Sequence, residues 1–184
     1  MAGFDRIHVL GASCCGTTTL GAALAARSNA RHLDTDDFYW TPTHPPYRQP
    51  RPLQERVSQL RAALDTAPAW VLSGSMVSWG DVFIERLDLV VFLTVPTEER
   101  MRRLRAREVA RYGEAMLAAG GAMHEQHLAF ADWAAAYDEG GLDMRSRARH
   151  EDWLGKITCP VIRLDGELPT TLQVQVIADW TSAA

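Results

Sequence analysis

Residues 11–20, with the sequence GASCCGTTTL, combine residue types and spacing that can bind phosphate. They directly follow an apolar run at residues 7–10 and directly precede an alanine-rich helical pattern at residues 20–26. The frame Gly11-x-x-x-x-Gly16-x-Thr18 fits a phosphate-binding loop, in which glycines let backbone N–H groups and a helix N-terminus face a polyphosphate. The alternative is a glycine-containing turn that only joins a strand to a helix. A dinucleotide fingerprint is a weaker interpretation, because it needs glycine where this chain has Ser13.

The loop departs from its motif at one position. Where the motif has a lysine that reaches the outer phosphates, this chain has Thr17, and Thr18 follows where a hydroxyl would ligate magnesium. A neutral threonine cannot balance phosphate charge, and losing one charge-stabilising group costs ~3 kcal/mol of transition-state stabilisation. The cation must therefore come from elsewhere in the chain.

Three carboxylates follow a short strand expected at residues 31–33, in the run Asp34-Thr35-Asp36-Asp37. Ligands bind at the carboxyl edge of open α/β sheets, where this run would lie. One carboxylate there can orient magnesium through water, and another can accept a proton from a substrate hydroxyl. A helix N-cap or turn cluster explains the same residues. The phosphate loop one strand away favours the functional interpretation.

Arginine supplies nearly all of the positive charge, because Lys156 is the single lysine among 19 basic residues. The planar guanidinium fork suits bidentate phosphate contacts. A helix expected to begin at Thr97 carries arginines at i, i+3, i+7 and i+11: Arg100, Arg103, Arg107 and Arg111. A solvated face is the alternative, since Glu99 can pair with Arg103. A second group lies further along the chain at Arg145, Arg147 and Arg149.

A proline-rich stretch at residues 41–52 follows the aromatic run Phe38-Tyr39-Trp40 and cannot hold a regular helix or central strand. Such a loop can enclose a flat or cyclic acceptor, with Arg48 and Arg51 placed to meet an anionic group on it. Aromatic side chains that cover the edge of the core are an equally good explanation. Gly74, at the end of a strand expected at residues 70–72, allows close approach to a substrate or forms a simple turn.

The elements that must position these residues follow from periodicity. Further strands are expected at residues 87–95 and 159–164, and the first of these is a continuous apolar run typical of a central parallel strand. Helices are expected at residues 53–65 and near the C-terminus, where Leu172, Val176 and Trp180 mark the pattern. Five short strands that alternate with helices indicate a doubly wound α/β fold with a parallel sheet.

Glycine pairs at residues 120–121 and 140–141 bracket a helical segment that we interpret as a hinged lid. Its stripe predicts packing rather than a cofactor-binding surface, and contains Met123, His127, Phe130, Ala134 and Tyr137. His124 and His127 lack the cysteine or carboxylate set that a metal site needs. We therefore expect a single domain over residues 1–184, with an acceptor-binding region at about 34–66 and a lid at about 112–150.

Length and composition set broad limits on function. With 184 residues and 47% hydrophobic content, the chain can bury one core and carry a small insert. The net charge of -4 argues against a general nucleic-acid binder. The three cysteines include an adjacent pair that cannot form an unstrained disulfide, which favours a reduced, cytoplasmic protein. We find neither a signal-peptide pattern nor a segment of membrane-spanning length.

Four stretches together resemble the adenylate-kinase-like family of small-molecule kinases: GASCCGTT, HLDTDD, LDLVVFLTVP with its arginine helix, and IRLDG. The resemblance spans nearly the whole chain. More narrowly, the chain is similar to predicted kinases described as adenylate kinase-related or topology-modulation proteins with a threonine-substituted loop. The family implies a five-stranded parallel sheet in the order 2-3-1-4-5, helices on both faces, a helical lid, and use of ATP with Mg²⁺.

The resemblance also implies roles for individual residues. Asp34 resembles the magnesium-orienting acid, Asp36 the acid at the substrate hydroxyl, and Asp165-Gly166 the turn near the adenine. The expected nucleotide-binding residues are Gly11, Ala12, Ser13, Cys14, Cys15, Gly16, Thr17, Thr18, Thr19, Arg103, Arg111, Asp165 and Gly166. The expected metal ligands are Thr18 and Asp34, and the expected catalytic residues are Asp36, Arg107 and Arg147. The residues expected to bind the acceptor are Asp36, Asp37, Tyr39, Arg48, Gly74, Arg145 and Arg149.

The sequence thus predicts transfer of a phosphoryl group from ATP to a small acceptor such as a nucleoside or nucleotide, with arginines stabilising the negative charge. The alternative is a non-catalytic module that closes its lid on a nucleotide and acts through a partner. Partners other than ATP and the acceptor, such as nucleic acid or a membrane, are not expected.

Overall fold

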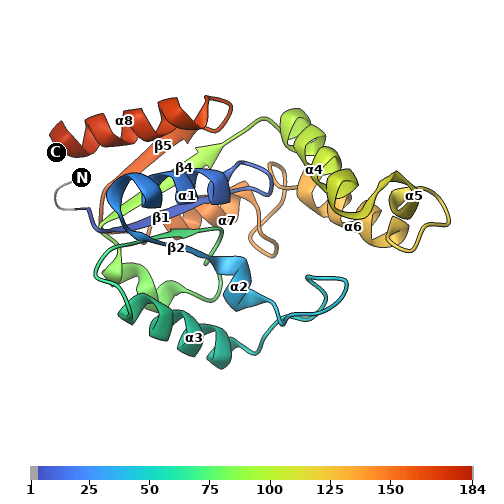
Figure 1. Cartoon of the computed structure of the whole chain (residues 1–184), viewed down its shortest axis with the longest axis horizontal. Coiled ribbons are helices and arrows are strands. Elements are labelled where there is room, and N and C mark those ends of the chain that lie inside the picture. Colours follow the sequence, from blue (N-terminus) through green and yellow to red (C-terminus); the bar gives the residue numbers. More distant parts are fainter. Residues whose placement is uncertain (1–3, 184) are drawn as a thin grey trace.

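The computed structural model describes residues 4–183, and its centre is one parallel sheet (Figure 1). The strand order is β2-β3-β1-β4-β5, and every neighbouring pair is parallel. This order confirms the predicted fold class. The strands are β1 (Arg6–Gly11), β2 (Arg31–Asp34), β3 (Trp70–Ser73), β4 (Leu89–Thr94) and β5 (Val161–Asp165).

Helices cover both faces of the sheet, as Figure 1 shows. Helices α1 (Thr17–Ser28) and α8 (Thr170–Ala183) pack on one face. The other face is covered by α3 (Leu53–Asp65), the 3₁₀-helix η1 (Asp81–Arg86) and α7 (Arg147–Leu154). The remaining helices are α2 (Thr35–Tyr39), α4 (Thr97–Tyr112), α5 (Glu114–Leu117) and α6 (His124–Ala135). In residues 4–183, no helix is both long enough and apolar enough to cross a bilayer.

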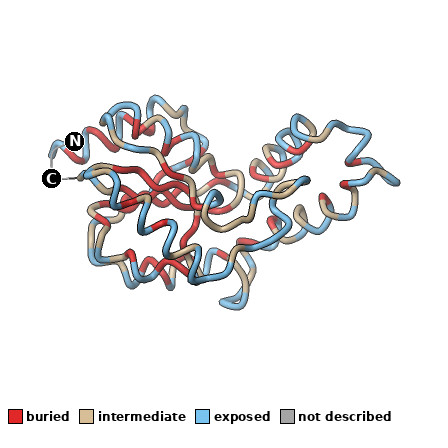
Figure 2. The backbone as a smooth tube through the Cα atoms, turned by 60° about the horizontal axis from the view of Figure 1, so that its bottom comes forward, coloured by how far each residue is buried: buried red, intermediate tan, exposed pale blue. Residues whose placement is uncertain are grey.

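The sequence of β4 is continuously apolar because both faces of this strand are buried. Leu89, Val91 and Leu93 join the hydrophobic cluster beneath α1 and α8, whereas Val90 and Phe92 join the cluster beneath α3 and α7. Alternate side chains point to opposite faces of a strand, so a strand buried on both faces needs apolar residues at every position. Figure 2 shows these buried strands running through the middle of the molecule.

Helix α8 forms where the sequence predicts it, but the residues that mark its pattern are not the ones it buries. Leu172, Val176 and Trp180 are exposed, whereas Val174 and Ile177 are buried in the core cluster. Trp180 packs at the rim of the fold against Phe4, with ring centroids 5.6 Å apart. Two apolar stripes run along this helix, and spacing alone does not distinguish the stripe that faces the sheet.

Helices α4, α5 and α6 extend to one side of the sheet (Figure 1) and are anchored at their base by a fully buried arginine. The guanidinium of Arg100 donates hydrogen bonds to the Val95 carbonyl at 3.2 Å and the Ala134 carbonyl at 2.9 Å. It also forms an ion pair with Asp138 at 2.8 Å. Arg100 therefore does not share an open, ligand-facing surface with the later arginines of α4, contrary to the prediction from their spacing, because the first turn of α4 packs against α6.

We predict that Asp138→Ala strongly destabilises the protein. The substitution leaves the buried Arg100 guanidinium without its carboxylate, which costs about 3–5 kcal/mol of unfolding free energy. Glu114→Ala is the matched control, because Glu114 pairs with Arg105 at 3.2 Å where both side chains are exposed. That control should cost less than about 1 kcal/mol. Urea unfolding measures both values, and equal losses would contradict the anchoring role of Arg100.

Candidate functional site

A cavity of about 880 Å³ opens where the carboxyl ends of β1 and β2 meet the α4 arginines. Its walls come from residues far apart in the sequence, which is typical of ligand sites at the switch point of a parallel sheet. The cavity is lined by residues 14–19 and by His32, Asp34, Asp36, Asp37, Tyr47, Arg103, Arg107, Arg111, Gly166, Leu168, Pro169, Thr170 and Gln173.

The glycine loop forms one wall of this cavity. Gly16 has a φ of 92°, in the left-handed region that favours glycine, and is the N-cap residue of α1. Because glycine has no side chain to cap the helix, the first N–H groups of α1 lack a capping partner from Gly16. Gly11 is required by close packing rather than by its φ angle, because a Cβ there would lie 2.6 Å from the Leu93 carbonyl oxygen. The loop therefore has the backbone geometry of an anion-binding helix N-terminus.

Asp34 joins three elements at the floor of the cavity. Its Oδ2 accepts hydrogen bonds from the Thr18 hydroxyl at 2.7 Å and the Ser73 hydroxyl at 3.2 Å. Its Oδ1 accepts from the Asp36 backbone N–H at 3.0 Å and caps α2, which confirms the N-cap interpretation. The contact with Thr18 places a hydroxyl and a carboxylate oxygen side by side.

The oxygen atoms of Thr18 and Asp34 fit a magnesium ion. Mg²⁺ prefers oxygen ligands and is held in such sites by one or two carboxylates together with substrate phosphates and waters. Among residues 4–183, no three His, Cys, Asp or Glu side chains converge into a metal cluster. The Thr18–Asp34 pair therefore suits a metal that enters with a phosphate ligand rather than one in an all-protein cage.

Asp36 and Asp37 titrate differently from ordinary carboxyl groups. Enclosure by the cavity walls, followed by the neighbouring Asp34 charge, raises the pKa of both groups. Asp36 as a residue is exposed to solvent, but enough protein atoms lie around its carboxyl group to reduce the hydration of the charged form. The positive charges of Arg145 and Arg107 act in the opposite direction, to lower its pKa. Asp36 is thus a more basic carboxylate than usual, even with these two positive charges acting on it.

Three arginines of α4 line the cavity, and each has different contacts within the protein. Arg103 donates to Glu99 at 2.6 Å and to the Gly166 carbonyl at 3.1 Å, so part of its charge is already balanced. Arg107 lies over the Phe130 ring at 5.9 Å, and no carboxylate in the described chain forms an ion pair with it. Arg111 lies over the Tyr47 ring at 5.1 Å and connects α4 to the proline-rich loop.

The turn at Asp165-Gly166 reaches the glycine loop from the other end of the chain. A Cβ on Gly166 would lie 2.9 Å from the Cys15 carbonyl oxygen, so only glycine allows this approach. Asp165 does not line the cavity; its Oδ1 accepts the Glu167 N–H at 2.8 Å and holds the turn. The first loop residues, Gly11, Ala12 and Ser13, lie next to the cavity lining.

Several residues predicted to bind the acceptor or to catalyse are not brought to this cavity. Arg147 pairs with Asp138 at 2.6 Å. Tyr39 packs beneath the Arg56 guanidinium at 3.8 Å, and Gly74 is in close contact with Thr35. Arg48 is exposed on the proline-rich loop. Arg145 does not line the cavity but contacts the glycine loop at Ser13.

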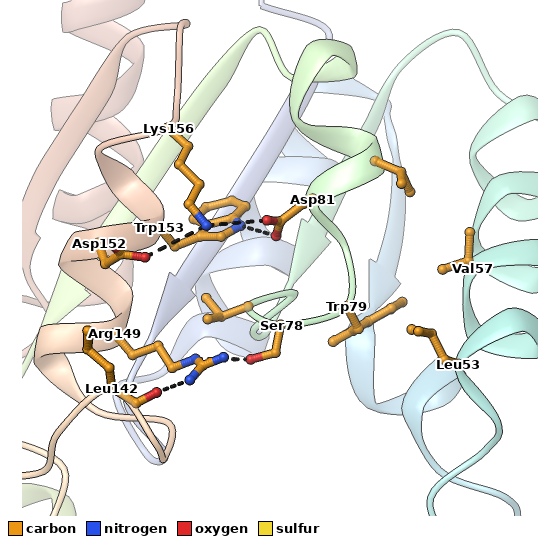
Figure 3. Close-up of a pocket in the computed structure, with 12 residues that line it drawn as sticks. Leu53, Val57, Ser78, Trp79, Asp81, Leu142, Arg149, Asp152, Trp153 and Lys156 are labelled. Atoms are coloured by element: carbon orange, nitrogen blue, oxygen red, sulfur yellow. Dashed lines mark hydrogen bonds and ion pairs between the residues drawn. The ribbon is translucent and has the colours of Figure 1, made fainter.

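Arg149 belongs to a second cavity, of about 470 Å³, between α3, η1 and α7 (Figure 3). Its Nε donates to the Ser78 hydroxyl at 3.1 Å, and its Nη1 donates to the Leu142 carbonyl. Lys156 lies across the same cavity, paired with Asp81 at 3.4 Å. The two cavities share no lining residue among those that the structure describes. Arg149 and Lys156 are therefore not cations for the glycine loop.

Sequence reasoning missed several residues of the first cavity: His32, Tyr47, Leu168, Pro169, Thr170 and Gln173. Tyr47 lies in the proline-rich stretch whose aromatic character indicated a binding wall, and it has a positive φ of 64°. Residues 168–173 directly follow the Asp165-Gly166 turn. Both could have been found from the sequence, because Tyr47 is next to Arg48 and residues 168–173 are close to Gly166, which were predicted site residues.

Residues 7–116, more than half of the chain, match the family model described as an AAA domain. The chain belongs to this family. Its relative from Bacillus subtilis (strain 168), the uncharacterized protein YqaC, is 42% identical over 178 residues, which cover 97% of this chain and 98% of that protein.

Solved structures show the same fold at low identity. Shikimate kinase from Bacteroides thetaiotaomicron has a TM-score of 0.59 and 18% identity, over 97% of this chain and 99% of that chain. Deoxyadenosine kinase from M. mycoides has a TM-score of 0.56 and 12% identity, over 97% and 100%. The chain of this AAA family member therefore has the fold of P-loop small-molecule kinases, which confirms the resemblance seen in the sequence.

We predict that Gly11→Ala destabilises the fold, because its Cβ would press on the Leu93 carbonyl where β1 pairs with β4. Overpacking of this kind costs about 1–3 kcal/mol. Gly155→Ala is the control: Gly155 has a helical φ of -63°, and the nearest atom to its Cβ is 3.3 Å away. The control should change stability by less than about 1 kcal/mol. Thermal and urea unfolding test the pair, and a larger loss at Gly155 would contradict this account.

Proposed function

We propose that this protein transfers the outer phosphoryl group of ATP to a hydroxyl or phosphate group of a small acceptor. The observation that carries the proposal is the single cavity that the glycine loop, the Thr18–Asp34 pair, Asp36 and the α4 arginines share. Phosphoryl transfer needs these parts together, because its catalysis consists almost entirely of positioning and charge stabilisation.

The nucleotide end of the cavity has the required groups. The N–H groups at the start of α1 and around Gly16 would face the phosphates, and Arg107 and Arg111 add positive charge from α4. Thr18 and Asp34 would hold magnesium, which supplies neutralisation of the phosphate charge when bound. The Gly166 carbonyl accepts a hydrogen bond from Arg103, and this turn, which lines the cavity, would contact the nucleoside part of the nucleotide.

Asp36 is the candidate base at the acceptor end. It would accept the proton of an acceptor hydroxyl while that oxygen forms a bond to the outer phosphorus. The bond from phosphorus to the bridging oxygen breaks at the same time, and ADP leaves with the electron pair. A raised pKa suits this role, because a general base is most effective when its pKa approaches the working pH.

Asp37 and Tyr47 line the same cavity and would contact the acceptor. Their carboxylate and phenol groups suit a polar acceptor such as a nucleoside, a nucleotide or a cyclic polyol. The shared fold of the shikimate and deoxyadenosine kinases supports this class of acceptor, because both act on small polar molecules named in their descriptions.

A nucleotide-sensing module that performs no transfer is the second candidate, and Thr17 favours it. A loop without lysine can keep its affinity for phosphates through N–H groups and still lack the charge needed in the transition state. Under this alternative, nucleotide binding changes the positions of helices α4–α6, and a partner protein binds the changed form.

A transfer assay separates the two candidates. The purified protein is incubated with magnesium and ATP labelled at the γ-phosphate, together with nucleosides, nucleotides or cyclic polyols, and products are separated by chromatography. The kinase proposal predicts a labelled acceptor that forms in proportion to enzyme. Nucleotide binding without a labelled product from any acceptor class would favour the sensing module instead.

We predict that Asp36→Asn lowers the transfer rate about a hundredfold or more while nucleotide affinity changes less than about threefold. The amide keeps the shape of the side chain but cannot accept the proton. Asp132→Asn, the same change at an exposed position on α6, is the control and should leave the rate unchanged. Steady-state rates and calorimetric titrations give the two quantities.

The pH profile adds an independent check on the same residue. The base must be ionised, and the pKa of Asp36 is raised above its ordinary value of 3.8. The wild-type rate should therefore fall as pH decreases through that raised pKa, at higher pH than an ordinary aspartate would give. An Asp36→Asn enzyme that keeps full activity would remove Asp36 from the mechanism.

A further inference from the structure

Arg145 contacts the glycine loop from the C-terminal half of the chain. Its Nη2 donates a hydrogen bond to the Ser13 hydroxyl at 2.6 Å, one residue before the cavity lining begins at Cys14. The guanidinium carbon lies 4.7 Å from the centre of the Trp133 ring, so α6 supports the side chain from behind. These two contacts fix a positive charge at the phosphate loop.

This guanidinium is not balanced within the protein. Its Nε is buried without a hydrogen-bond partner, and no carboxylate in residues 4–183 forms an ion pair with it. A buried charge that lacks a partner is costly, so the site favours an anion that would pair with it. Burial accordingly lowers the pKa of Arg145, although arginine remains cationic at neutral pH.

Arg145 reaches one end of the glycine loop and α1 begins at the other. Its contact is with Ser13, the residue that precedes the cavity lining, whereas α1 starts at Thr17. An outer phosphate at the Ser13 end of the loop would therefore meet the Arg145 guanidinium, whereas inner phosphates would lie along the loop towards the N-terminus of α1.

The other arginines near the loop are placed differently. Arg147 shares the Asp138 carboxylate with Arg100, and Arg103 is paired with Glu99. Arg107 and Arg111 line the cavity and contact the aromatic rings of Phe130 and Tyr47, and among the described residues neither donates a hydrogen bond to the glycine loop. Arg145 thus has the direct loop contact that a substitute for the missing lysine needs.

We propose that Arg145 supplies the positive charge that Thr17 does not, and that it acts on the outer phosphate of the bound nucleotide. The proposal rests on the proposed function for the identity of the ligand. Its planar fork can donate to two phosphate oxygens, or to Ser13 and one phosphate oxygen, where a lysine would present a single ammonium.

The test is a double-mutant cycle of Arg145→Gln and Thr17→Lys, read by calorimetric titration with magnesium and a non-hydrolysable ATP analogue. Glutamine can keep the hydrogen bond to Ser13 but removes the charge. We expect Arg145→Gln to weaken analogue binding at least about tenfold. Affinity for ADP, which lacks the outer phosphate, should change less than about threefold. Thr17→Lys should restore analogue binding in the Arg145→Gln protein. In the wild-type background the same substitution should change the affinity for the analogue much less.

Two controls separate charge from folding. Arg105→Gln removes a lid guanidinium that pairs with Glu114 outside the cavity, and its affinity should match the wild type. Arg145→Lys keeps a cation at the position, and its affinity for the analogue should stay within about threefold of the wild-type value. Circular dichroism and thermal unfolding of each variant report on folding, and a folding defect would not be corrected by a lysine at position 17.

Three results would overturn the inference. The first is that the Arg145→Gln protein binds the analogue as tightly as the wild type. The second is that Thr17→Lys changes the affinity for the analogue by the same factor in the wild-type and Arg145→Gln proteins, because equal effects show that the two residues act independently. Absence of analogue binding by the wild type would overturn the inference together with the proposed nucleotide site. A transfer assay run in parallel keeps the claims distinct, because dependence on Arg145 without a labelled product would contradict only the kinase proposal.

Discussion

The balance of charge around the glycine loop is the constraint on which the rest of this site depends. Asp34, Asp36 and Asp37 line the same cavity, where burial, followed by the Asp34 charge, raises the pKa of Asp36 and Asp37. A polyphosphate would add several further negative charges to this small volume. With Thr17 in the loop, the compensating cations must come from other elements, and the structure brings arginines there from α4 and from the segment before α7.

The same residue type serves two separate purposes in this chain. Arg100 is fully buried and is satisfied by Asp138 and by backbone carbonyls, so it stabilises the packing of α4 against α6 at the edge of the sheet. Arg107 and Arg145 have no such carboxylate in the described residues and remain able to pair with a ligand. This division separates an arginine that holds α4 against α6 from arginines whose charge has no carboxylate partner among the described residues.

The fold could be predicted because its signals are local. The apolar run of β4 is continuous since both faces of the strand are covered, and the glycines of the loop are required by backbone geometry. The placement of Thr18 and Asp34 at one site followed from similar logic, because the carboxyl ends of all strands in a parallel sheet lie at the same edge, even though β3 separates β1 from β2. The bounds of α3 could be read directly from its apolar spacing.

The directions of the arginines could not be predicted in this way. Arg145, Arg147 and Arg149 are close in sequence, yet they reach the glycine loop, Asp138 and the second cavity respectively. The chain changes from an irregular segment to α7 at Arg147, so no single period relates the three side chains. Arg100 and α8 show the same limit, since helical spacing defines a face but not the element packed against it.

The most direct test of this account is a crystal structure of the protein with magnesium and a non-hydrolysable ATP analogue. The account predicts the polyphosphate against the backbone N–H groups of residues 14–18, magnesium at the oxygens of Thr18 and Asp34, and the outer phosphate between Arg145 and Asp36. A nucleotide bound elsewhere, or an outer phosphate directed away from both Arg145 and Asp36, would contradict it.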